Sequence, residues 1–469
     1  MFPQLAATFF AAVQAPVEAP APASGWTVEL STLRLLREKG VLSQEELDSA
    51  VRDVLDTEGV RAPDGHTLSV GRFALTAFGF AELRGLYDTT QSFPEQQSNA
   101  QVARPDSFAG THDRFQLSAR SSRLGFRLKA PPWAGLRASA MVELDFSGQQ
   151  LPAPSLASEA PQLTVRARHY YLKVETPVVD LLAGQSWSVF SGQPGSLPAT
   201  LDLHGLPGEA YTRTPQLRLS RRFALPEVSL DVALAVARGP QRDSALPDGA
   251  VAVRLSVTRW TAWSTQAFVA SSQQSASLGV SGLLRGYRVT DVVAAPTSST
   301  RLLAGGVAAH LLVPLVPGTA EQHAGALTLV GQYVWGTGIA DQYTGLTGGV
   351  TAPSLQNLDS GLVAIDGTTG APVTVQWSSG YLNLQYYLPV WDGRVWLSTL
   401  YSRLWSNDTA RLGPGSKTRA SLDWLTFAAF ADLLPSVRVG LEYAVTFDRF
   451  NDGVTAVNHR TDFAAVFVF

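Results

Sequence analysis

Residues 113–147, DRFQLSARSSRLGFRLKAPPWAGLRASAMVELDFS, decide the fold of this chain. They read as two long strands joined by a turn at residues 130–134, and apolar and polar residues alternate along each strand. In the first strand the apolar positions shift by one residue between Leu117 and Leu124, which predicts a bulge at residues 120–122. One face is wholly apolar and the other carries charges of both signs. This pattern is typical of strands with lipid on one side and water on the other.

The composition favours a membrane barrel over a soluble protein. Of the 469 residues, 45% are hydrophobic and 16% are charged, yet no run of 18 apolar residues marks a transmembrane helix. A chain that spans a membrane without such helices needs a closed barrel, because every backbone polar group must be hydrogen-bonded internally. The 40 glycines and 28 prolines supply many turns, and the absence of cysteine is compatible with export.

The segments before the barrel differ in character from the strands. Residues 1–25 hold an apolar core and an Ala/Pro-rich tail, which predicts a signal peptide, with a disordered N-terminus as the alternative. Residues 26–58 predict two short helices, either a periplasmic coiled coil at an oligomer axis or a solvated appendage. Residues 59–70 are a linker, and residues 71–469 form an all-β transmembrane antiparallel barrel.

About sixteen strands are expected in the barrel, with segments 250–258 and 260–270 counted separately. Residues 186–214 break the alternation and are expected to fold into the lumen, where their backbone can be satisfied. Residues 88–112 and 337–372 read as exterior loops. Aromatic residues near strand ends suggest girdles at the membrane interfaces; they are Tyr386, Tyr387, Trp391, Trp396, Tyr401, Trp405 and Trp424.

Three segments together resemble the DcaP-like trimeric porins of Gram-negative outer membranes. They are DRFQLSARSSRLGFRLKAP, RARHYYLKVETPVVDLLAGQSWSVF and YTRTPQLRLSRRF. The resemblance implies a sixteen-stranded homotrimeric porin with arginines at a constriction and a preference for anions. The residues that match the three motifs are Arg120, Arg123, Gln185, Trp187, Arg213 and Arg218. The closing strand, which ends at Phe469, resembles the signal that the barrel-assembly machinery recognises.

Arginine on the polar face of these strands is the main candidate for function. Guanidinium groups stay charged in any environment and bind carboxylate or phosphate through paired hydrogen bonds, so several of them in a narrow lumen favour anions. Glu143, Asp145 and Glu175 are expected on the opposite wall. The candidate pore-lining residues are Arg84, Arg120, Arg123, Arg127, Arg137, Arg166, Arg168, Gln185, Trp187, Arg213, Arg218 and Arg222.

The sequence therefore predicts an outer-membrane porin for passive diffusion of small hydrophilic solutes, with dicarboxylates or phosphate-bearing compounds favoured. A general or cation-tolerant porin and a non-conducting structural barrel are the alternatives. The chain is not expected to be an enzyme or to bind a cofactor, a metal or nucleic acid, since it shows no zinc-ligand spacing, phosphate loop or dinucleotide fingerprint. The expected partners are small anions, membrane lipid, further copies of the chain and the assembly machinery.

Overall fold

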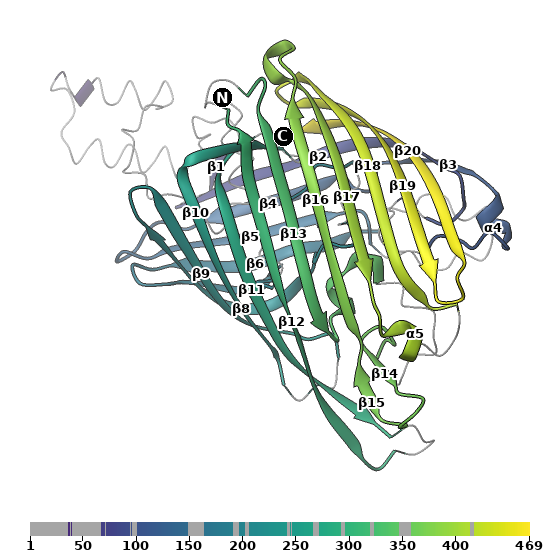
Figure 1. The fold of residues 1–469 in the computed structure, drawn as a ribbon. Coiled ribbons are helices and arrows are strands. Elements are labelled where there is room, and N and C mark those ends of the chain that lie inside the picture. Colours follow the sequence, from purple (N-terminus) through teal and green to yellow (C-terminus); the bar gives the residue numbers. More distant parts are fainter. Residues whose placement is uncertain are drawn as a thin grey trace.

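The protein is a closed antiparallel β-barrel with short turns at one end and long loops at the other (Figure 1). The predicted fold class is confirmed. Segments 1–25 and 26–58 lie outside the described residues, except for Leu36, Arg37 and Lys39. Among the described residues, no helix is long and apolar enough to cross a membrane. The computed structural model describes residues 36–37, 39, 67–70, 72–93, 95, 101–148, 164–190, 197–201, 206–241, 244, 246–265, 272–291, 296–318, 323–346, 358–412 and 417–469.

The wall of the barrel consists of strands that pair in the order of the chain, except that β3 and β4 both pair with β2. These strands are β2 (Phe73–Asp88), β3 (Arg114–Ser118), β4 (Arg123–Lys129), β5 (Arg137–Asp145), β6 (Arg166–Glu175), β7 (Asp180–Trp187), β8 (Arg213–Ala224), β9 (Val228–Ala237), β10 (Asp248–Ser264), β11 (Ser272–Thr290), β12 (Ser299–Val316), β13 (Leu327–Thr337), β16 (Gln376–Tyr387), β17 (Val395–Trp405), β18 (Arg419–Leu434), β19 (Val437–Phe450) and β20 (Thr455–Val468). The short elements are β1 (Thr67–Val70), β14 (Val363–Ile365), β15 (Pro372–Thr374), α4 (Phe108–Thr111), α5 (Thr409–Leu412) and the 3-10 turns η3 (Ala340–Gln342), η4 (Thr344–Leu346) and η5 (Trp391–Gly393).

In the described part of the chain sixteen strands close the barrel, because β3 and β4 share one position beside β2. Residues 119–122 interrupt that position. The exposed apolar side chains of β3 and β4 have odd numbers up to Leu117 and even numbers from Leu124 onward, so the alternation shifts by one residue and the predicted bulge is confirmed. The prediction of two strands at 250–258 and 260–270 was wrong. Residues 250–258 and 260–264 both belong to β10, whose register shifts between Val257 and Thr261, and a bulge of this kind imitates a strand break in the sequence pattern.

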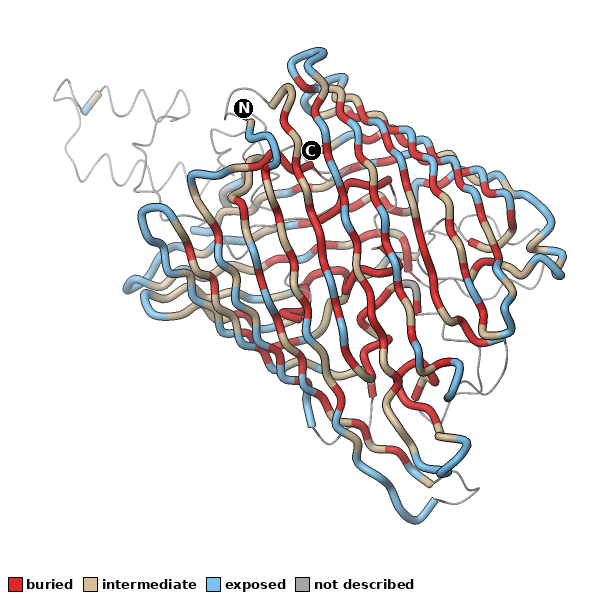
Figure 2. The backbone as a smooth tube through the Cα atoms, in the orientation of Figure 1, coloured by how far each residue is buried: buried red, intermediate tan, exposed pale blue. Residues whose placement is uncertain are grey.

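The barrel has an apolar outer surface. Exposed and buried residues alternate along each strand (Figure 2). In β4 the exposed side chains include Leu124 and Phe126, and in β20 they include Phe463 and Phe467, as the alternation predicted. A continuous band of exposed leucine, valine and phenylalanine is unfavourable in water and suits hydrocarbon. The barrel therefore spans a membrane.

The seam between β2 and β20 closes the barrel. Residues 80–88 pair with residues 460–468. Arg84 forms an ion pair with Asp462 across this seam, and Arg460 forms another with Asp88, with 2.7 Å between Nη2 and Oδ2. All four side chains are at most 1% exposed. One further strand, β1, lies in the predicted linker and pairs with the start of β2.

The segment between β7 and β8 folds into the lumen, as predicted; residues 188–212 are called the inward loop below. Its Ala199 N–H donates to Asn383 Oδ1 (3.1 Å) on β16, and its Leu201 N–H donates to Glu442 Oε2 (2.8 Å) on β19. These strands lie across the barrel from β7 and β8, because β16 is six or seven strand positions away in one direction around the wall and β19 is six or seven away in the other. Side chains of the far wall therefore hold the inward loop by its backbone.

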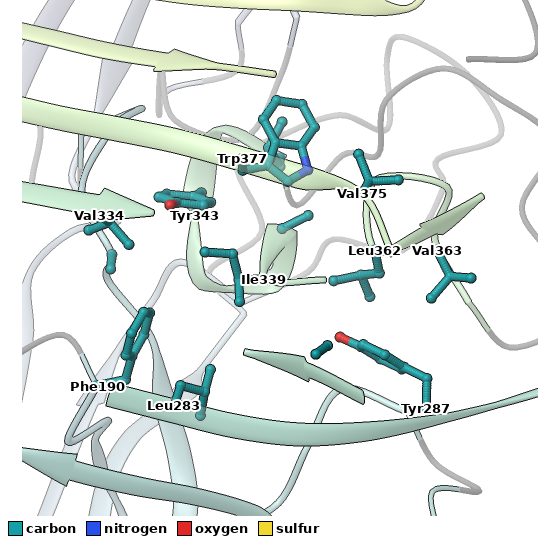
Figure 3. Packing of buried hydrophobic residues seen from close by; sticks show 14 of the residues in the cluster. Phe190, Leu283, Tyr287, Val334, Ile339, Tyr343, Leu362, Val363, Val375 and Trp377 are labelled. Atoms are coloured by element: carbon teal, nitrogen blue, oxygen red, sulfur yellow. The ribbon is translucent and has the colours of Figure 1, made fainter. Parts of the chain in front are cut away.

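The loop between β13 and β16 also enters the barrel, which corrects the prediction of an exterior loop for its first part. Ala210 of the inward loop forms a β-bridge with Tyr343, and both residues are fully buried. An apolar cluster joins the two loops to the wall (Figure 3). Its core contains Phe190, Leu283, Tyr287, Val334, Ile339, Tyr343, Leu362, Val363, Val375 and Trp377. The Gly/Thr-rich sequence identified a loop but not the side of the wall on which it lies.

The first long loop, after β2, packs back onto the barrel. Phe93 and Val102 are buried against Phe450 and Ala456 at the ends of β19 and β20. Outside this cluster, Arg104 forms an ion pair with Asp452 in the β19–β20 turn (2.6 Å). The loop therefore covers this part of the rim.

The girdle prediction was wrong for three of the aromatic residues named above. Tyr387, Trp396 and Trp424 are buried inside the barrel, where Trp396 stacks on Phe430 with 4.0 Å between ring centroids. The position of each residue in the alternation places these three side chains on the inner face, because neighbouring residues on a strand point to opposite faces. The aromatic residues that do lie exposed on the outer side include Tyr386, Trp391 and Tyr401.

Candidate functional site

An arginine cluster lines the inner wall where the inward loop begins and ends. It consists of Arg123 on β4, Arg166 and Arg168 on β6, and Arg213 on β8. These strands lie in one part of the wall, separated only by β5 and β7, so residues that are 90 positions apart in the sequence are brought together. The electrostatic neighbours of Arg213 are the three other arginines and Tyr211.

A β-bulge positions the centre of the cluster. In the pairing of β5 with β6, Glu143 faces His169 and Leu144 faces Ala167, so Arg168 is the extra residue. As a result Arg168 and His169, although consecutive, are both buried on the inner side. Bulges redirect side chains in this way and occur often beside functional sites.

Two carboxylates neutralise part of the cluster from the adjacent strand β5. Arg168 donates to Glu143 (2.6 Å) and to Asp145 (2.8 Å), and Arg166 donates to Asp145 (2.6 Å). The prediction that Glu143 and Asp145 stand on the opposite wall was therefore wrong. Cross-strand pairing placed them next to the arginines, and it likewise pairs Glu175 with Arg137.

Arg213 is held by aromatic rings rather than by a carboxylate. Its guanidinium carbon lies 4.9 Å from the ring centre of Trp187 and 5.9 Å from that of Tyr211. The two rings are 4.4 Å apart, and His169 packs on Trp187 at 5.3 Å. The Nη1 atom of Arg213 is buried and has no hydrogen-bond partner among the described residues. An arginine in this state has donors available for an anion.

Arg218 is a second arginine held without a carboxylate. It lies buried on the inner side of β8, and its Nε donates to Gln216 Oε1 (3.0 Å) while Nη2 donates to the carbonyl of Trp187. Neutral oxygen atoms thus orient this guanidinium without cancelling its charge. Nearby on β4, Arg127 lies over the ring of Phe78 at 5.8 Å.

Three of the other candidate arginines form ion pairs on the inner side. Arg84 pairs with Asp462 at the seam, as described above. Arg120 donates to Glu95 (2.9 Å) and to the carbonyl oxygen atoms of residues 146 and 148. Arg222 lies 3.6 Å from Asp231. Each of these charges is at least partly balanced by its partner.

Two candidates do not lie where a pore-lining role requires. Gln185 is on the outer side of β7, where it donates to the backbone of residues 167 and 168 and accepts from the hydroxyl of the exposed Tyr170 (3.2 Å). Arg137 lies at the end of β5 beside the short turn, is 59% exposed and pairs with Glu175 (3.0 Å). The motif match that suggested Gln185 carried no information about which face it occupies.

Two features of the site were not predicted. Tyr211 comes from an irregular segment without periodicity, so no pattern in the sequence indicated that its ring would frame Arg213. Glu82 on β2 is buried near Arg84 and Arg123 and adds a third carboxylate to this region. The four arginines of the cluster still outnumber the carboxylates Glu82, Glu143 and Asp145.

The chemistry available here is reversible anion binding. Guanidinium groups in a confined site form paired hydrogen bonds to carboxylate or phosphate. In the described part of the chain, no group of three or more histidine, cysteine, aspartate or glutamate residues is arranged to hold a metal ion.

Comparison with known proteins shows similarity in fold. No protein-family model and no curated protein sequence matches this chain. Among solved structures, the outer membrane channel DcaP of Acinetobacter baumannii matches with a TM-score of 0.60 and 16% identity, over 85% of this chain and 97% of that chain. OmpT of Vibrio cholerae gives 0.46 and 10%, over 86% and 100%. OprB of Pseudomonas putida gives 0.44 and 9%, over 83% and 94%.

The match to DcaP confirms the fold that the resemblance to DcaP-like porins implied. This chain has the fold of an outer-membrane channel.

Proposed function

We propose that this protein is a porin of a Gram-negative outer membrane, through which small hydrophilic solutes diffuse passively with a preference for anions. Dicarboxylates and phosphate-bearing compounds are the preferred solutes. The observation that carries the proposal is Arg213, whose charge is framed by Trp187 and Tyr211 and surrounded by further arginines. Diffusion down a gradient needs no cofactor.

The physical basis is a local excess of positive charge where the inward loop narrows the lumen. The ion-paired arginines contribute little to selectivity, since their partners cancel much of their field. Arg213 and Arg218 keep their charge, because aromatic rings and neutral oxygen atoms hold them. A charge in a passage with low-dielectric walls acts over a longer range than the same charge in bulk water. Anions are therefore concentrated at this level and cations are depleted.

The assembly state follows the family resemblance and remains part of the proposal. We infer a homotrimer inserted by the barrel-assembly machinery through β20 and the following Phe469. The exposed Phe463 and Phe467 on one face of β20, together with the exposed Phe469, support the second inference.

Two alternative functions have specific observations in their favour. Most candidate arginines have a carboxylate partner, which favours a general or cation-tolerant porin. The apolar cluster that fills part of the lumen favours a barrel that does not conduct. The proposed function differs from both in requiring a chloride-directed reversal potential.

The test is the reversal potential of the purified protein in a planar bilayer under a potassium chloride gradient. The wild type should show a potential towards the chloride equilibrium value. The variant Arg213→Gln/Arg218→Gln should move it towards zero. Arg221→Gln is the matched control, because Arg221 lies on the same strand, is exposed and donates to a backbone carbonyl near the short turns.

Each outcome of this test has a clear meaning. A wild-type potential at zero or towards potassium contradicts the anion preference and leaves a general porin. A chloride-directed potential that the double variant does not change contradicts the role of the two arginines. Folded protein without conductance supports the structural barrel.

A further inference from the structure

The outer surface of β13, β16, β17, β18 and β19 has an unusual composition near the long loops. The strand register places Tyr333, Gly380, Arg403, Asp423 and Phe447 side by side in one row across these five strands. Alternation puts this row on the outer face, because Tyr333 and Arg403 are both about half exposed. Charged residues thus lie on a surface that elsewhere carries apolar side chains.

A groove begins beside Arg403 in this surface. Gly380 lies directly between Tyr333 and Arg403, and Gly331 lies directly between Leu311 and Leu382. Because neither glycine has a side chain, the side chains of the neighbouring strands border an open hollow of about 450 Å³. Its walls are mainly apolar and include Leu278, Ala309, Leu311, Tyr333 and Leu382, with Arg403 at one edge.

Two arginines share one carboxylate at the edge of this groove. Arg403 and Arg449 both pair with the buried Asp423, and their own side chains are 47% and 45% exposed. The hydroxyl of Tyr401 also donates to Asp423 (2.5 Å), which further occupies that carboxylate. Counting only residues that the structure describes, these ion pairs leave the site with one positive charge in excess. Arginine on the lipid-facing side of a barrel is unfavourable unless it lies near the membrane interface or meets an anion.

The site lies close to the membrane–water interface at the end of the barrel that carries the long loops. Arg403 is two residues from the end of β17, and Arg449 is one residue from the end of β19. Each guanidinium packs on an aromatic ring of its own strand, Arg403 on Trp405 at 5.4 Å and Arg449 on Phe447 at 5.8 Å. Aromatic residues of this kind mark the level of the lipid headgroups. The cations thus face headgroups while the groove faces acyl chains.

We propose that this surface binds a phosphorylated glycolipid of the outer leaflet. One phosphate lies between Arg403 and Arg449, and one acyl chain lies in the groove over Gly331 and Gly380. Guanidinium groups are well suited to phosphate, and the hollow suits a flexible apolar chain. The proposal depends on the outer-membrane location proposed above, with the long loops at the cell surface as in other barrels of this kind, but not on anion preference in the lumen.

The test is native mass spectrometry of delipidated protein with defined lipids. The probes are a diphosphorylated acylated glycolipid, the same glycolipid without phosphate, phosphatidylglycerol and inorganic phosphate. We expect the diphosphorylated glycolipid to bind at least about tenfold more tightly than the other three. The variant Arg403→Gln/Arg449→Gln should lose this difference, and Ala309→Leu, which fills the groove, should weaken binding of both glycolipids.

Two controls separate this proposal from its competitors. Arg221→Gln removes an exposed arginine near the short turns and should leave glycolipid binding unchanged. Because Arg403 and Arg449 face away from the lumen, their double variant should keep the wild-type reversal potential, so a failure here differs from a failure of the proposed pore.

The results that overturn the proposal are equally specific. Equal binding of phosphatidylglycerol would show a general anionic-lipid surface, and binding of inorganic phosphate alone would show that no acyl chain is recognised. If Ala309→Leu lowers the oligomer mass without affecting glycolipid binding, a second copy of the chain occupies the groove. Unchanged binding in the double arginine variant would exclude the two arginines as the phosphate site.

Discussion

Replacing Phe190 by alanine should release the inward loop from the lumen wall. Phe190 is fully buried, and its ring packs in the apolar cluster with residues of β11, β13 and the loop between β13 and β16 (Figure 3). Its carbonyl also accepts from the hydroxyl of Ser281, a bond that the substitution leaves in place. The change therefore tests side-chain packing alone.

The expected cost is about 3–5 kcal/mol, the usual range for removing a buried phenylalanine ring. Because each 1.4 kcal/mol corresponds to a factor of ten, the equilibrium for local loop opening should shift by about two to four orders of magnitude. The strands of the wall do not depend on this ring for their hydrogen bonds. The effect should thus be concentrated in the loop.

Amide hydrogen exchange followed by mass spectrometry measures this effect. The N–H groups of Ala199 and Leu201, which donate to the far wall, should exchange faster by a similar factor in the Phe190→Ala variant. Phe126→Ala is the matched control, since Phe126 is exposed on the outer side of β4. Unchanged exchange at Ala199 and Leu201, with protein shown to be folded, would refute the idea that the cluster holds the loop.

Two further predictions concern ion pairs in different environments. Arg84→Met should lower the free energy of unfolding by about 3–5 kcal/mol, because it removes the guanidinium group that pairs with the buried carboxylate of Asp462, and Arg84→Met/Asp462→Leu should recover part of this loss in thermal unfolding. The hydrogen bond from Arg104 holds the pKa of Asp452 below its usual range. Its contribution to holding the first loop should be present above the ordinary aspartate pKa of about 3.9 and be lost as the pH falls further. Exchange at residues 101–104, relative to the intrinsic exchange rate at the same pH, should therefore rise in acid, and Asp452→Asn should remove this relative rise.

The sequence predicted the wall of this barrel well because each strand carries its own evidence. The alternation of Leu124 and Phe126 with Arg123 and Arg127 gives both the strand and its two faces. Even the bulge before Arg123 was visible in the sequence as a one-residue shift in the alternation of apolar and polar residues. Such signals are local, so they need no knowledge of the rest of the chain.

What the sequence did not contain was the partner of each side chain. The arginines of β6 and the acids of β5 were expected on opposite walls, and only the strand register shows that they are adjacent. Alternation also assigns a residue to a face without saying which elements cover that face. Trp396 and Tyr401 therefore looked alike in the sequence, although one packs inside the barrel and the other lies on its surface.

The seam between β2 and β20 also provides a check on correct closure. The partners Arg84 and Asp462 are 378 residues apart, and Asp88 and Arg460 are 372 apart, so neither pair can form before the whole barrel has been made. A slip of one residue would turn these charges towards lipid, and a slip of two would separate each from its partner. A barrel closed in the wrong register would thus be less stable at the last step of assembly. The residues at the two ends of the barrel sequence therefore favour the correct register between the first and last strands.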